Sequence, residues 1–118
     1  MLIPLDFCDI ELYHSYVIIT IHKDIDLCLT RASVIRELLQ NHFGQTPFVM
    51  ISNREYKHTV QPEVYRKGQL KNMKGLAIVS TQKTERDQAL IDQKMFDKSF
   101  AFFHDMETAK SWASDYFL

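Results

Sequence analysis

The sequence predicts an α/β domain with the element order ββαβαβαβα, in which four helices pack on a mostly parallel five-stranded sheet. Two observations carry this prediction. Short apolar runs alternate along the chain with segments of helical periodicity, as they do in α/β proteins. The later runs are apolar at nearly every position, which is typical of parallel strands that are covered on both faces. Because 118 residues with 46% hydrophobic content suit one core, we expect a single domain over residues 1–118.

The N-terminal part of the chain begins with a predicted antiparallel hairpin. Residues 7–13 alternate loosely between apolar and polar side chains, and residues 16–21 form a dense β-branched and aromatic run. Apolar residues then recur at helical spacing over residues 28–43, so a helix is expected there. We expect Asp24 or Asp26 to accept hydrogen bonds from the free N–H groups at its start.

The middle of the chain holds two more predicted strands, each followed by a predicted helix. Residues 48–51 and 76–79 are short apolar runs. After the first run, Pro62 is well placed to start a helix that includes Val64 and Tyr65 and that could extend to Leu70 and Met73. After the second run, residues 84–87 read Thr-Glu-Arg-Asp and resemble a capping box. The inward side of the helix that follows is expected to carry Ala89, Leu90, Met95 and Phe96.

The sequence ends on a predicted strand that is tied directly to a helix. The strand covers the apolar residues 100–103, and Asp105 is placed to cap the helix. Small and aromatic residues follow at helical spacing. We expect Trp112 to pack in the core rather than stack on a ligand, because it can bury roughly 150–250 Å² of aromatic surface.

Three stretches of the chain resemble the SpoIIAA-like family, relatives of the STAS domains of anti-sigma-factor antagonists. They are PFVMISNREY (47–56), LKNMKGLAIVST (70–81) and FAFFHDMETAKSWA (100–113). The family's terminal pattern, F-x-F/V-F-x-D-x-E-x-A-x-x-W, is met here by Phe102, Phe103, Asp105, Glu107, Ala109 and Trp112. The resemblance covers most of the chain and implies a β–α superhelical fold used for regulation, protein association or small-ligand binding, generally without catalysis.

At one point the sequence departs from the phospho-switch members of the STAS group. Those proteins carry an Asp-Ser-Ser-Gly-like segment after the third strand, whereas residues 52–65 here read SNREYKHTVQPEVY. Thr59 lies only loosely near the acceptor position. We therefore expect a recognition surface that is not switched by phosphorylation.

Composition and spacing argue against several function classes. A net charge of −1 provides no overall field for nucleic acid, and no apolar run approaches the roughly 18 residues of a membrane span. The opening residues lack a positively charged n-region, so we expect a cytoplasmic protein. Its reduced Cys8 and Cys28 are expected to be small core residues. No glycine lies in a strand-to-helix turn and the five histidines are scattered, so we expect no phosphate-binding loop, metal site or cofactor.

The candidate ligand-binding residues follow the predicted strand at residues 48–51. In open parallel sheets, ligands gather beyond the carboxyl ends of the strands. We therefore predict a ligand-binding site at Ser52, Asn53, Arg54 and Tyr56. The alternative interpretation is that these polar residues are ordinary turn and cap residues.

Charge is distributed unevenly along the chain. Residues 54–74 contain six basic and two acidic side chains, whereas residues 1–30 contain five acidic side chains and one lysine. A solvated helix face is the usual meaning of such a run. The alternative, which we adopt as a prediction, is a partner-binding face that includes Arg54, Lys57, Arg66 and Lys67.

From these features we expect a small regulatory or binding module, not an enzyme, that recognises a protein partner or a small anionic ligand. The alternative is a small-molecule or lipid carrier, or a minor enzyme, with its site at the carboxyl ends of the strands. Nucleic acid is not an expected partner. The sequence leaves open whether the domain is a monomer or a homodimer.

Overall fold

A six-stranded sheet forms the centre of the computed structural model. The structure describes residues 1–67 and 70–118, except for the side chains of residues 92 and 95. Its strands are β1 (Leu2–Pro4), β2 (Cys8–Leu12), β3 (Tyr16–Ile21), β5 (Phe48–Asn53), β7 (Met73–Val79) and β8 (Ser99–Phe103). They lie side by side in the order β1-β2-β3-β5-β7-β8. The first three strands pair antiparallel, and the pairs from β3 to β8 are parallel. A separate small sheet pairs β4 (Asp26–Leu27) with β6 (Thr59–Val60) in parallel.

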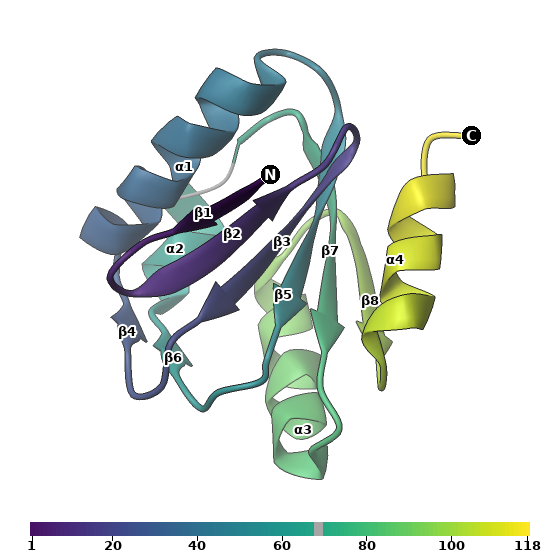
Figure 1. Cartoon of the computed structure of the whole chain (residues 1–118). Helices are drawn as coiled ribbons and strands as arrows, with labels where there is room; N and C mark the ends of the chain where they lie inside the picture. The colour runs from purple at the N-terminus through teal and green to yellow at the C-terminus, as the bar shows by residue number, and fades with distance from the viewer. Residues whose placement is uncertain (68–69) are drawn as a thin grey trace.

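The helices cover both faces of the main sheet (Figure 1). They are α1 (Leu29–Phe43), α2 (Pro62–Lys67), α3 (Lys83–Asp92), which continues into the 3₁₀ turn η1 (Gln93–Met95), and α4 (Met106–Asp115). One core cluster joins the sheet to α1, α2 and α3, through Ile35, Tyr65 and Ala89 respectively. A second cluster joins the opposite face to α4 through Ala109 and Ala113. The result is a sheet between one layer of three helices and a single helix.

The predicted α/β class, the hairpin and the mostly parallel sheet are confirmed. Each predicted strand and helix is present. The helix that starts at Pro62 is shorter than predicted: it ends at Lys67, and Met73 begins β7 instead. The sheet has one strand more than expected, because β1 pairs with β2 at the edge. Three residues that include an exposed Leu2 and a proline carry too little periodicity to predict a strand. The same holds for the two-residue strands β4 and β6.

The prediction that Asp24 or Asp26 caps the start of α1 is wrong. The residue that precedes the helix is Cys28, which makes no capping hydrogen bond through its side chain. The Asp26 carboxylate is used elsewhere: it accepts hydrogen bonds from Thr59 Oγ1 and Gln61 Nε2, both at 2.7 Å. These two bonds hold the pKa of Asp26 below its usual value and tie β4 to β6. Cys8 is buried as expected, whereas Cys28 is only partly buried, because it lies ahead of the helix rather than on its apolar stripe.

The expected capping box of α3 is also absent. The helix begins one residue before Thr84, and the residue that precedes it, Gln82, makes no side-chain cap. The Gln82 N–H instead donates a hydrogen bond to Ser80 Oγ at 3.1 Å. The Glu85 carboxylate is drawn away from the helix start by an arginine, as described below.

The inward side of α3 is narrower than expected. Ala89 and Phe96 are buried, as predicted. Leu90 is exposed, because adjacent residues on a helix point about 100° apart and only one of the pair can face the core. The expectation for the Met95 side chain lies outside the part of the chain that the structure describes.

The last helix starts and packs as the sequence predicts. Asp105 Oδ1 accepts a hydrogen bond from the Thr108 N–H at 2.8 Å, and this bond lowers the pKa of Asp105. Trp112 packs against the core with Phe103 and Tyr116, at ring-centroid distances of 5.8 and 5.2 Å. Trp112 is only partly buried. Gly75 lies under this ring: a Cβ atom there would be 3.4 Å from Trp112 Cη2.

We expect Trp112→Ala to lower the free energy of unfolding by about 2–3 kcal/mol, less than the roughly 3–5 kcal/mol for a fully buried tryptophan, because Trp112 is only partly buried. Trp112→Phe keeps part of the contact and should cost under about 1.5 kcal/mol. Urea unfolding measures both values. Equal stability of the alanine variant and the wild type would show that the contact with the sheet contributes nothing.

Candidate functional site

An apolar cavity of about 100 Å³ lies between the main sheet, α1 and α2. Aliphatic side chains form most of its wall, and they come from β3, β5, β7 and the two helices. Examples are Ile19, Met50 and Ile78 from the sheet, Ala32 from α1 and Val64 from α2. Five polar or charged side chains interrupt this wall: Arg36, Ser52, Arg54, His58 and Tyr65.

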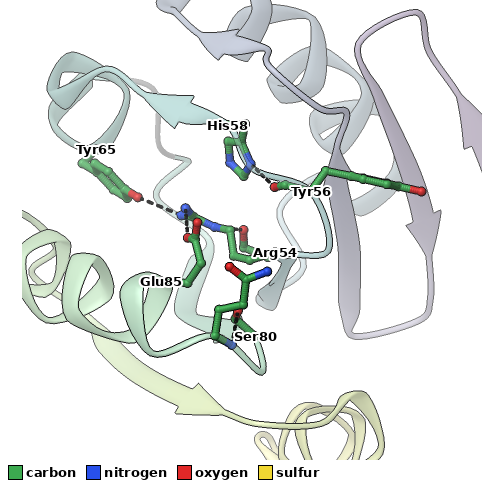
Figure 2. A network of polar contacts seen from close by, with 8 residues as sticks. Arg54, Tyr56, His58, Tyr65, Ser80 and Glu85 are labelled. Carbon is green, nitrogen blue, oxygen red and sulfur yellow. Dashed lines mark hydrogen bonds and ion pairs between the residues drawn. The ribbon is translucent and has the colours of Figure 1, made fainter.

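Arg54 is the most highly connected of these polar residues (Figure 2). It follows the last residue of β5, and its N–H donates to the Val79 carbonyl oxygen at 2.9 Å, which extends the pairing with β7. Its side chain is only 6% exposed. Nε donates to Ser52 Oγ at 3.0 Å, Nη2 donates to the Tyr65 hydroxyl at 3.4 Å, and Nη1 lies 3.5 Å from Glu85 Oε2. One guanidinium therefore connects the end of β5 to α2 and α3.

Strand alternation explains which of the predicted ligand-binding residues reach the cavity. Successive side chains of a strand point to opposite faces, so Ser52 and Arg54 follow Met50 toward the cavity. Asn53 does not line the cavity, and its Nδ2 donates to Thr20 Oγ1 at 3.2 Å. Tyr56 is 42% exposed, and only its carbonyl oxygen takes part in the network, as the acceptor for His58 Nδ1 at 3.2 Å. The structure thus brings two of the four residues to the cavity.

The predicted basic face needs one correction. Arg54 was expected to be exposed together with Lys57, Arg66 and Lys67, but it is buried. A buried guanidinium needs hydrogen-bond acceptors and an opposite charge, and Ser52, Tyr65 and Glu85 meet this need. The other three residues are exposed, in the loop before β6 and in the last turn of α2.

Sequence reasoning missed Glu85 and Arg36 as parts of this site. The Thr-Glu-Arg-Asp pattern suggested that Glu85 belongs to a capping box at the start of a helix. Its ion pair with Arg54, 31 positions earlier in the chain, was therefore not predicted. Arg36 did leave a signal. It lies four residues after Ala32 and three before Leu39, on the buried stripe of α1, where a charge is unusual.

Two observations concern metal ligands and membrane spans in the part of the chain that the structure describes. There, no three His, Cys, Asp or Glu side chains gather as metal ligands. Within the same residues, no helix is both long and apolar enough to cross a bilayer. Thr59, the residue nearest to a phospho-acceptor position, uses its hydroxyl as a donor to Asp26.

The Arg54 network should stabilise the fold measurably. We expect Arg54→Met to lower the free energy of unfolding by about 1–3 kcal/mol, because the variant keeps the apolar stem but removes the ion pair with Glu85 and the hydrogen bond to Tyr65. Lys57→Met, a matched change at an exposed basic residue, should stay within about 0.5 kcal/mol of the wild type. Urea unfolding compares the two, and equal values would contradict a structural role for Arg54.

The comparisons with known proteins agree with this fold. No protein-family model and no curated protein matches the sequence. In structure, the chain is similar to the crystal structure of an uncharacterized protein from the DUF3478 family with a SpoIIAA-like fold, from Shewanella loihica PV-4. The similarity covers 90% of this chain and 91% of that chain, with a TM-score of 0.63 and 17% identity. At this identity the likeness shows the fold alone, and it confirms the fold that the resemblance implied: the chain has a SpoIIAA-like fold.

Proposed function

We propose that this domain is a binding module, not an enzyme, that holds a small apolar ligand in the cavity between the main sheet, α1 and α2. The cavity itself carries the proposal. Protein interiors contain few voids larger than a water molecule, whereas ligand sites are concave and mostly apolar with a few polar groups. The cavity in this domain has a volume of about 100 Å³ and is lined by aliphatic side chains and a few polar ones, so it resembles a ligand site more than an ordinary packing void.

The volume limits what can bind. An engineered apolar cavity of about 150 Å³ binds benzene, and drug-sized ligands occupy about 300–1,000 Å³. A cavity of about 100 Å³ therefore suits one small ring or a short branched chain. A longer molecule, such as a lipid, would insert only its apolar end.

The polar groups of the site support binding more than catalysis. The Ser52 hydroxyl accepts a hydrogen bond from Arg54, and a guanidinium stays protonated and cannot act as a general base. Arg54 is in turn held by Tyr65 and Glu85. Such a network positions side chains. This agrees with the SpoIIAA-like resemblance, which implies regulation or binding generally without catalysis.

Filling the cavity should abolish binding. We expect benzene to shift the methyl NMR signals of the lining residues in the wild type, and Ala32→Leu to remove this effect because its side chain occupies the same space. Ser33→Leu is the matched control, since it makes a comparable change at the neighbouring exposed position of α1. Benzene should bind this control as it binds the wild type. If the wild type shows no shift, or if Ala32→Leu binds equally well, the proposed site is wrong.

Recognition of an acidic partner is a second candidate function, which the exposure of Lys57, Arg66 and Lys67 favours. Exposed basic residues contribute little individually, but together they steer association and add specificity. The contact would use these three side chains without Arg54, which is buried.

Reversing all three charges to Glu should abolish binding of a fluorescent hexaglutamate peptide at low salt, measured by anisotropy, because attraction becomes repulsion. Wild-type binding should weaken as salt is added, since salt screens exposed charges. A control that reverses Lys83 and Lys110, which lie on α3 and α4, should keep the binding. Both variants should melt within a few degrees of the wild type. Salt-independent binding, or equal loss in the control, would contradict this surface.

A further inference from the structure

The wall of the cavity carries an excess of positive charge. Two guanidinium groups line it, those of Arg36 and Arg54, and no Asp or Glu is among the described residues that do so. Glu85, behind the wall, pairs with Arg54. Counting these three residues, one positive charge is left over, that of Arg36, which is partly exposed.

The two arginines differ in how they are satisfied. Arg54 contacts Ser52, Tyr65 and Glu85, so its donors and its charge have partners. Arg36 Nε is buried, and within residues 1–67 and 70–118 it has no hydrogen-bond acceptor. No carboxylate of that part of the chain forms an ion pair with Arg36. A buried charged donor without an acceptor is unfavourable, and an acceptor supplied by a ligand would remove this cost.

We propose that the ligand of this cavity is a small organic monoanion: a carboxylic acid whose apolar body fills the cavity and whose carboxylate binds Arg36. The inference rests on the proposed function, because it uses the same cavity and names the chemical class of the ligand. A carboxylate presents two acceptor oxygens in a plane, which matches the donors of a guanidinium. Its single negative charge would balance the one positive charge that remains when Arg36, Arg54 and Glu85 are counted together.

The apolar surroundings strengthen this preference. Attraction between opposite charges is larger where water is partly excluded, as it is at the buried Nε of Arg36, although the residue as a whole is partly exposed. Arg54 can stay paired with Glu85, because Arg36 supplies the free donor. A neutral molecule of the same shape would fill the cavity but would leave Arg36 without an acceptor.

The test compares benzoate with benzamide, its neutral isostere, at neutral pH on the full chain, with binding followed by methyl NMR. We expect benzoate to bind at least about tenfold more tightly, the lower range for a hydrogen bond to a charged group. Arg36→Met should remove the preference and still bind benzene, which shows that the cavity is intact. Arg31→Met is the matched control: Arg31 is also on α1 but outside the cavity, and the preference should remain.

The outcomes separate this inference from the proposed function. Equal affinity for benzoate and benzamide, or a preference that survives Arg36→Met, would contradict the proposal that Arg36 binds an anionic ligand. The cavity would remain a binding site. Tighter binding of phenyl phosphate than of benzoate would contradict the proposal that the ligand is a carboxylate with a single negative charge. Loss of benzene binding by the wild type would overturn the site itself. If Arg36→Met does not fold, Arg36→Lys serves instead: it keeps the charge but not the planar donors, and it should reduce the preference for benzoate.

Discussion

The parallel pair β5 and β7 at the centre of the sheet is the constraint on which the rest of the structure depends. Both strands carry buried apolar residues on both faces: Phe48 and Ile78 toward α1, and Ile51 and Ala77 toward α4. Removal of this surface from water is the main favourable term in folding, so helices must cover both faces. A single helix covers one face through the small residues Ala109 and Ala113, which allow close approach. Three helices share the other face, and the cavity lies on that side.

The site follows from how β5 ends. Its apolar alternation continues into Ser52 and Arg54, so a polar and a charged side chain point to the face that is otherwise apolar. A buried guanidinium without partners would be strongly destabilising. Tyr65 of α2 and Glu85 of α3 satisfy it, and these contacts tie both helices to the end of the strand. The interaction that completes the fold is thus also part of the wall of the cavity.

Much of the fold could be predicted because its signals are local. The apolar runs of β3, β5, β7 and β8 and the helical spacing of α1 each extend over enough residues to be read from the sequence. The cap of α4 at Asp105 depends on contacts three residues apart and was also predicted correctly. The caps of α1 and α3 were not, because Asp26 and Glu85 bond to residues more than 30 positions away. The short strands β1, β4 and β6 were missed because they depend on their pairing partners rather than on their own pattern.

The sequence by itself determined the class and the order of the elements, since these depend on periodicity. Only the tertiary structure decided which polar residues reach the cavity. It turned Arg54 inward to Glu85, left Lys57 in solvent and brought Arg36 of α1 to the same wall. The physical reason is that burial and charge pairing are set by neighbours across the sheet, which strands and helices far apart in the chain supply.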